Sequence, residues 1–203
     1  MKKFLAVLSI AVLGLVSIGC TNGSSQANTN TAPNTQTTNT NDKKETTDKK
    51  KVLIIYYSRS GNTQELAQQI QQQTSGDIVR IEPVKAYPAT YEETTKQAKE
   101  EQQAGFKPEI KPLNINLQDY DTIYLGSPCW WSNLATPVVT FLSDNDLSGK
   151  TIALFMTHGG SGFGRSIEHI KELAPNSTVK EGLAVKSSNV KNAQNDIKNW
   201  LAK

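Results

Sequence analysis

From residue 51 to the end of the chain, short apolar runs alternate with longer polar segments. The run 51–57, KVLIIYY, is typical of a strand that is buried on both faces of a parallel sheet. In the segment 64–73, the apolar residues recur at spacings of three and four, which predicts a helix. The same patterns predict further strands at 77–81, 121–127, 150–157 and 182–185, and further helices at 90–104, 134–142, 166–173 and 189–201. The alternation predicts an α/β domain over residues 51–203, with helices on both faces of a parallel sheet and ligands at the carboxyl ends of its strands.

The first 20 residues have a different pattern. Lys2 and Lys3 precede an apolar run that ends at Val16 and is followed by Ser17, Ile18, Gly19 and Cys20. This run is shorter than the roughly 20 residues of a membrane-spanning helix, so residues 1–20 are predicted to be a signal peptide. Their end resembles the lipobox of bacterial lipoproteins, although Ser17 stands where leucine is usual. The resemblance implies lipidation at Cys20 and a protein that is exported and lipid-anchored to the cell membrane, with its domain outside the cytoplasm. The alternative is ordinary secretory cleavage, which would leave Cys20 as a free thiol.

Residues 21–50 contain nine Thr, six Asn and no large apolar side chain. Such a segment cannot bury enough surface to offset the entropy of ordering, so we expect a disordered tether. Of the 22 Lys and Arg, six precede residue 51, as do three of the 19 Asp and Glu, which leaves 16 of each sign in the domain. This balance gives no sign of a nucleic-acid partner. The only cysteine besides Cys20 is Cys129, so lipidation would leave no internal disulfide.

The loop after the first predicted strand has the composition of a phosphate-binding loop. It consists of Ser58, Arg59, Ser60, Gly61, Asn62 and Thr63. Hydroxyl groups, a glycine and backbone amides at the start of a helix form a site for a phosphate monoester. A tight turn with Asn62 or Thr63 as the helix cap is the alternative, but one cap needs only one polar residue.

This loop resembles the phosphate loop of flavodoxins, whose pattern is Ser/Thr-x-Ser/Thr-Gly-x-Thr, and the resemblance extends over residues 51–203. It implies a flavodoxin-like doubly wound sheet of five strands in the order 2-1-3-4-5, and FMN as the cofactor. The loop lacks the Gly-Lys-Ser/Thr of nucleoside-triphosphatases and the cysteine of phosphatases with this topology. Gly126 and Ser127 end the third strand, where response regulators of this architecture carry an aspartate.

Two adjacent tryptophans follow the third predicted strand. The loop contains Pro128, Cys129, Trp130, Trp131, Ser132 and Asn133. In flavodoxin relatives the equivalent loop packs an aromatic side chain against the isoalloxazine ring, which favours a flat ligand. Alternatively, one or both tryptophans plug the edge of the domain. No second thiol or paired histidine is evident near Cys129, so we interpret it as a packing residue rather than a nucleophile.

The loop after the fourth predicted strand is rich in glycine. Its candidate binding residues are Thr157, His158, Gly159, Gly160, Gly162 and Gly164. Glycines allow the backbone to approach a planar ring closely. By the resemblance, the amides of this loop would bond the pyrimidine edge of the flavin and tune its reduction potential. His158 has two interpretations of equal weight, as a proton donor to reduced FMN or as a cap of the loop.

Three functions remain open from the sequence. The first is electron transfer between partners at a membrane or surface, which the tether favours. The second is an FMN-dependent reductase of quinones or similar acceptors, with NAD(P)H or another donor. The third is a flavin-binding surface protein whose redox activity is incidental. The partners we expect are a redox protein or a small acceptor such as a quinone, together with the membrane.

Replacing Cys20 by Ala removes the expected attachment point for lipid, so we predict that the protein leaves the membrane fraction. Cell fractionation and detergent phase partitioning measure the change. Cys129→Ala, which keeps Cys20, is the matched control. Membrane association that persists in Cys20→Ala would show that this cysteine is not the anchor.

Overall fold

The computed structural model describes residues 51–203, so the predicted signal peptide, lipidation site and tether lie outside the described residues. The main parallel strands are β1 (Val52–Tyr56), β2 (Asp77–Arg80), β3 (Thr122–Trp130) and β5 (Thr151–His158). Their order is β2-β1-β3-β5, and the sheet ends with β6 (Thr178–Val179) and β7 (Leu183–Lys186), which both pair with β5. The predicted α/β fold and the order 2-1-3-4-5 are confirmed, with the fifth strand divided into β6 and β7.

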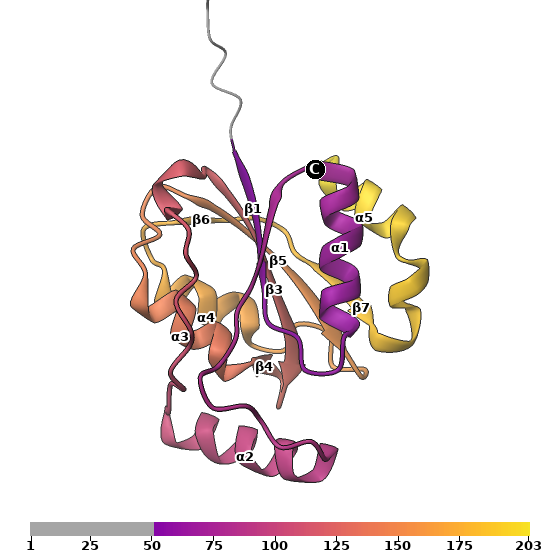
Figure 1. Cartoon of the computed structure of the whole chain (residues 1–203). Helices are drawn as coiled ribbons and strands as arrows, with labels where there is room; N and C mark the ends of the chain where they lie inside the picture. Colours follow the sequence, from indigo (N-terminus) through magenta and orange to yellow (C-terminus); the bar gives the residue numbers. More distant parts are fainter. Residues whose placement is uncertain (1–50) are drawn as a thin grey trace, which may run out of the picture. The chain divides into compact units, whose positions relative to one another are not determined.

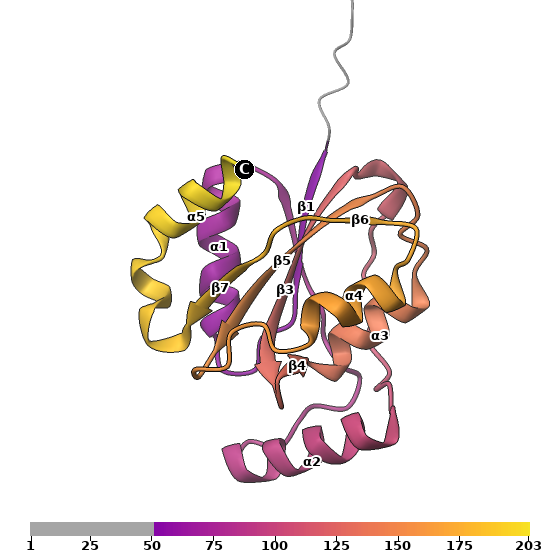
Figure 2. The ribbon, with the colours of Figure 1, turned by 180° about the vertical axis from the view of Figure 1, so that it is seen from behind.

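Helices cover both faces of the sheet, as predicted. Figures 1 and 2 show α1 (Asn62–Thr74) and α5 (Gln194–Leu201) on one side of the strands, and α3 (Thr136–Asp144) and α4 (Ser166–Leu173) on the other. Neighbouring residues of β1 point to opposite faces, so Leu53 and Ile55 join one apolar cluster while Ile54 and Tyr56 join the other. Burial on both faces accounts for the uninterrupted apolar run at 51–57.

One helix does not cover a face of the sheet. α2 (Tyr91–Ala104) lies beyond the carboxyl ends of the strands, below β3 and β4 (Asn133–Leu134) in Figure 1. It buries only Thr94, Ala98 and Glu101, so it has too little apolar surface to cover the sheet. Apolar residues from the segment after α2, which includes the short helix η1 (Leu117–Asp119), pack against the core there instead: Ile110, Leu113, Ile115 and Leu117.

Several boundaries differ from the predicted ones. β3 continues to Trp130 and turns back through β4, where the sequence predicted a loop. The last predicted helix, at 189–201, is divided into the 3-10 helix η2 (Ser187–Asn192) and α5, and Val190 is buried in η2. Pro137 lies in the first turn of α3, as predicted. Within residues 51–203, the helices are too short or too polar to span a bilayer.

Gly126 in β3 has no room for a side chain. An ideal Cβ there would overlap the ring of Phe155 and lie 2.5 Å from the Cβ atom of Tyr56. Gly126→Ala is therefore predicted to lower the free energy of unfolding by about 1–3 kcal/mol through overpacking. Urea unfolding measures the change. Gly159→Ala is the control, because a Cβ at Gly159 meets nothing within 4 Å. Equal stabilities of the two variants would contradict the prediction.

Candidate functional site

The three loops singled out in the sequence meet α2 around one cleft. Its volume is about 640 Å³, and it lies at the carboxyl ends of β1, β3 and β5. Residues of the three loops and of α2 share its wall, together with Ser187 of η2. The lining residues are Arg59, Ser60, Asn62, Tyr91, Thr94, Thr95, Ala98, Pro128, Cys129, Trp130, Trp131, Ser132, Thr157, His158, Gly159, Ser161 and Ser187.

At one side of the cleft, α1 begins without a side-chain cap. Its N-cap is Gly61, whose φ of 91° is in the left-handed region that favours glycine. The Ser58 hydroxyl accepts a hydrogen bond from the Gly61 amide at 3.2 Å, which closes the loop beneath the helix. The first amide groups of α1 thus remain available to an acceptor, and the positive end of the helix favours an anionic one.

Arg59 brings a fixed positive charge to the same side. Its Nε donates to the Thr94 hydroxyl at 2.9 Å, and one Nη donates to the Ala89 carbonyl at 2.8 Å. Both acceptors are neutral, so the guanidinium charge is not cancelled by an ion pair within residues 51–203. Arg59 thereby connects the first loop to α2 and leaves this side of the cleft electropositive.

Some residues of the first loop support the cleft from behind. The Thr63 and Thr157 hydroxyls form a buried hydrogen bond of 2.8 Å between α1 and the end of β5. Ser58 and Gly61 also do not line the cleft, while Arg59, Ser60 and Asn62 do. The loop therefore has an outer polar surface and an inner set of hydrogen bonds that hold its shape.

The two tryptophans occupy a β-hairpin that the sequence did not predict. β3 and β4 are joined by Trp131 and Ser132, with φ of 49° and 59°, which is the pattern of a type I′ turn. Such a conformation is unusual for a bulky aromatic residue and costs on the order of 1–3 kcal/mol. Interactions of the indole offset part of this cost. Trp131 Nε1 donates to the Thr95 carbonyl at 2.9 Å, and Lys99 Nζ lies 4.9 Å from the ring centroid.

Trp130 and Trp131 have different surroundings. Trp130 packs edge-on against Tyr87 at 4.9 Å and Tyr57 at 5.4 Å between ring centroids. Trp131 is 53% exposed at the rim of the cleft. Trp130 therefore completes an aromatic cluster at the edge of the domain, whereas Trp131 has a ring that a flat ligand can reach.

The hairpin is held by the end of α2. Gln102 Nε2 donates to the carbonyls of Trp130 at 2.8 Å and Leu134 at 3.1 Å. The neighbouring Glu101 carboxylate is buried and accepts hydrogen bonds from Tyr87, Thr136 and Gln97. Burial, followed by the hydrogen bond to Glu101, raises the pKa of the Tyr87 phenol above its ordinary value, so Tyr87 remains a donor.

The third loop is also fastened to the hairpin. The Arg165 amide donates to the Ser132 carbonyl at 2.8 Å, and a Cβ at Gly164 would overlap that carbonyl. Gly164 is therefore required for a close approach between two backbone segments. Gly160, Gly162 and Gly164 do not line the cleft, whereas Gly159 does. The Ser161 hydroxyl lies 3.1 Å from Cys129 Sγ, which links the second and third loops.

His158 caps the third loop. Its Nδ1 accepts a hydrogen bond from the Gly162 amide at 3.1 Å, so this nitrogen carries no proton. Burial lowers the pKa of His158 below its ordinary value, and the charge of Lys186 lowers it further. This hydrogen bond supports the interpretation of His158 as a cap of the loop.

The family model for flavodoxin matches residues 51–203, which is most of the chain. The chain belongs to the flavodoxin family. This confirms the family that the first loop resembles.

Solved structures similar to this flavodoxin include three flavoproteins. The one from Bacteroides uniformis has 25% identity and a TM-score of 0.68, and the match covers 76% of this chain and 99% of that chain. The one from Bacteroides eggerthii has 27% identity and a TM-score of 0.62, covering 73% and 98%. The one from Lactobacillus acidophilus, in complex with FMN, has 28% identity and a TM-score of 0.60, covering 75% and 99%. No curated protein matches the chain. Each of these solved chains consists almost wholly of the matched domain.

Sequence reasoning missed part of the flavodoxin cleft. The additional lining residues are Tyr91, Thr94, Thr95, Ala98, Ser161 and Ser187. The helix at 90–104 was predicted, but its periodicity carries no signal that it lies across the strand ends. Asn133 was predicted to line the cleft, but it lies outside it. Its Oδ1 accepts a hydrogen bond from the Leu134 amide at 2.9 Å and lies 3.0 Å from His169 Nδ1. Within residues 51–203, no group of His, Cys, Asp or Glu side chains is arranged to hold a metal.

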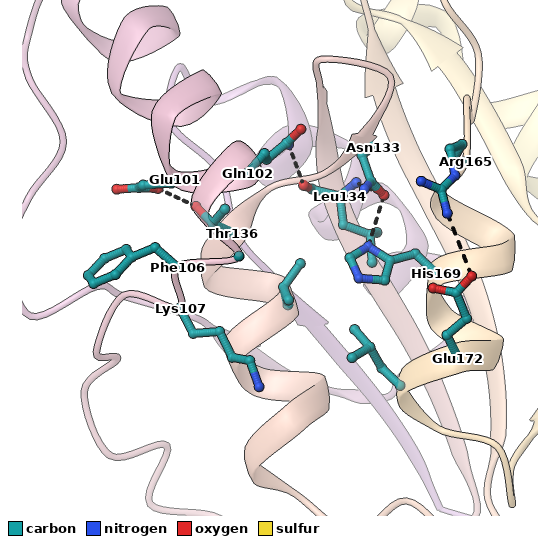
Figure 3. Close-up of a pocket in the computed structure, with 13 residues that line it drawn as sticks. Glu101, Gln102, Phe106, Lys107, Asn133, Leu134, Thr136, Arg165, His169 and Glu172 are labelled. Atoms are coloured by element: carbon teal, nitrogen blue, oxygen red, sulfur yellow. Dashed lines mark hydrogen bonds and ion pairs between the residues drawn. The ribbon is translucent and has the colours of Figure 1, made fainter.

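A second cavity of about 310 Å³ borders the other side of the hairpin in this flavodoxin. Figure 3 shows His169 and Arg165 reaching it from α4, and Lys107 reaching it from the segment after α2. Asn133 of β4 and Glu101 of α2 complete its polar wall. No pattern in the sequence predicts this cavity.

The His158 cap predicts a pH dependence of stability. Folding lowers the pKa of His158. As pH falls below about 6.5, this histidine is therefore protonated in the unfolded chain before it is protonated in the native state. The free energy of unfolding should therefore be constant above pH 7.5 and should decrease as pH falls toward the native pKa. His158→Gln should reduce this decrease, and adding His169→Gln should reduce it further, because burial also lowers the pKa of His169, the only other histidine. Urea unfolding at pH 8 and pH 5.5 measures it, and an unchanged decrease in His158→Gln would rule out this origin.

Proposed function

We propose that this flavodoxin binds FMN in the 640 Å³ cleft and transfers electrons between redox partners. The observation that carries the proposal is that one cleft contains both an uncapped helix start beside Arg59 and the exposed indole of Trp131. These two features match the two ends of FMN, which are a phosphate dianion and a planar ring. The similar flavoprotein from Lactobacillus acidophilus, which was solved in complex with FMN, supports the choice of cofactor.

In this proposal the phosphate lies against the first turn of α1. Backbone amides there have no side-chain cap, and Ser60 and Asn62 add polar side chains on the same wall. The guanidinium of Arg59 adds a charge that is held in place by Thr94 of α2 and by the carbonyl of Ala89, which precedes that helix. Fixed donors of this kind bind an anion without the entropic cost of ordering flexible side chains.

The ring of FMN lies between the hairpin and the third loop. Trp131 offers an aromatic face, and its hydrogen bond to Thr95 fixes the orientation of the indole. Gly159 leaves the opposite wall without a side chain, so the backbone of the third loop can approach the ring edge. When bound, FMN supplies reversible electron transfer. Trp131, Gly159 and the loop backbone orient it and exclude water from one side.

His158 holds the third loop in this mechanism. Since its Nδ1 is occupied by the Gly162 amide, the neutral ring carries its proton on Nε2. Burial keeps the imidazole neutral near pH 7, so it adds no positive charge beside the ring. Nδ1 of His158 therefore holds the shape of the loop, and its Nε2–H remains available as a hydrogen-bond donor.

We also propose that the domain works outside the cytoplasm, tethered to the membrane through Cys20 and residues 21–50. A tether restricts the domain to partners at the same surface and raises their effective concentration. The balanced charge of residues 51–203 supports this arrangement, because a near-neutral domain gains little from electrostatic steering toward a diffusing partner.

A visible spectrum tests the proposed function. The 51–203 domain is mixed with FMN and desalted, and NADH or NADPH and then a quinone are added. We expect a retained flavin that a chemical reductant bleaches but NAD(P)H does not. Rapid bleaching by NAD(P)H with recolouring by the quinone would favour the reductase instead. Loss of all flavin on desalting would overturn the assignment of FMN.

The phosphate end is tested at Gly61. Gly61→Asp places a carboxylate at the start of α1, next to the proposed position of the phosphate, so FMN affinity should fall at least about a hundredfold. Gly61→Asn has nearly the same size and the same backbone demand at φ 91° but no charge, and it should bind FMN far more tightly than Gly61→Asp. Fluorescence quenching of FMN measures both affinities. Equal affinities of the Asp and Asn variants would contradict the assignment of the phosphate to this loop.

A further inference from the structure

The 310 Å³ cavity between α2, α3 and α4 combines an apolar floor with two unused polar groups. Leu134, Val139 and Leu173 line its floor. Lys107 and His169 reach its wall from different elements (Figure 3). This cavity differs from the larger cleft, since it has about half the volume and no tryptophan in its wall.

The charges around the cavity are already paired, with one exception. The Glu101 carboxylate is saturated by Tyr87, Thr136 and Gln97. Glu172 lies 3.6 Å from Arg165, and both side chains are largely exposed. Within residues 51–203, Lys107 has no carboxylate within ion-pair distance. The ammonium of Lys107 is thus the cation that remains free to receive an anionic ligand.

His169 is held in one orientation and one tautomer. The Asn133 Oδ1 accepts the Leu134 amide at 2.9 Å, which identifies this atom as the oxygen of the side-chain amide. His169 Nδ1 lies 3.0 Å from the same oxygen, so Nδ1 carries the proton that is donated to it. The neutral ring therefore has an unprotonated Nε2, and no donor within residues 51–203 is bonded to it.

We propose that this cavity is a second ligand site, which binds a small aromatic carboxylic acid with its ring on the apolar floor and its carboxylate between Lys107 and His169. The cavity volume suits a single ring rather than a flavin. The site is separate from the proposed FMN site, and its occupation requires no flavin.

Binding of the carboxylate takes up a proton. Burial lowers the pKa of His169, and the charge of Arg165 lowers it further, although the Glu172 carboxylate acts in the opposite direction. The imidazole is therefore neutral at pH 7 in the free protein. A carboxylate beside Nε2 favours the charged imidazole, so one proton is taken from solvent onto Nε2 as the ligand binds. Lys107, Glu101, Arg165 and Glu172 are the other ionisable groups that face this site.

Imidazole NMR of the ¹⁵N-labelled 51–203 domain tests the site, because the chain has only two histidines. The probe is benzoate at pH 7, in the absence of FMN. We expect saturable shifts of His169 from the Nδ1–H tautomer to the doubly protonated form, while His158 is unchanged. Shifts confined to His158, or no saturation at tens of millimolar benzoate, would overturn the proposal.

Variants separate recognition of the carboxylate from simple apolar burial. Lys107→Gln should weaken benzoate about fivefold, the size expected for one partly exposed ion pair. Lys111→Gln is the matched control, since Lys111 pairs with Glu82 away from the cavity. Calorimetry in two buffers of different ionisation enthalpy should report proton uptake in the parent and none in His169→Gln. Equal binding of benzyl alcohol, or unchanged affinity in Lys107→Gln, would contradict carboxylate recognition.

Discussion

The side chains of Glu101 and Gln102 fix α2 across the carboxyl ends of the strands. Gln102 bonds two carbonyls of the β3–β4 hairpin, and Glu101 bonds Tyr87 and Thr136 from different parts of the chain. α2 buries few apolar side chains, so these hydrogen bonds hold the helix where hydrophobic burial cannot. Each contributes about 0.5–1.5 kcal/mol, or more where the acceptor is charged. Without these hydrogen bonds the 640 Å³ cleft would lose the wall that Thr94, Thr95 and Ala98 provide.

The β3–β4 hairpin is the partition between two cavities. Trp131 and Ser132 border the flavin cleft, whereas Asn133 and Leu134 border the smaller cavity beside α4. The hairpin is bonded on one side to α2 and on the other to Arg165 at the start of α4. This short segment thus carries residues that line both cavities. The third loop needs glycine at Gly164 because a side chain there would overlap the Ser132 carbonyl of the hairpin.

The sequence predicts the sheet well because burial on both faces leaves a local signature. The run 51–57 and the helix spacing at 64–73 contain the information that places β1 and α1. The position of α2 could not be predicted, because its pattern is amphipathic only weakly and its location depends on partners such as Trp130 and Leu134. The hairpin was missed for a related reason. Type I′ turns are recognised by Asn-Gly or similar pairs, and Trp131-Ser132 does not have that chemistry.

For the candidate site, the composition of the loops was sufficient to locate it, but the sequence could not show which residues each side chain contacts. The three loops were found because polar, aromatic and glycine residues follow predicted strands, and the structure brings all three to one cleft. The sequence could not distinguish Trp130, which packs on Tyr57 and Tyr87, from its exposed neighbour. Nor could it find Ser187, whose contribution depends on η2 returning to the strand ends.

Under the proposed function, the positive φ of Trp131 places stability and FMN binding in opposition at one residue. A glycine or asparagine would suit this turn better, and selection for thermal resistance alone would favour that replacement. The large ring persists there only while a benefit at the cleft outweighs the backbone strain. Descendants of this protein that abandoned the flavin would therefore be free to lose the indole first, and would become more stable as they did so.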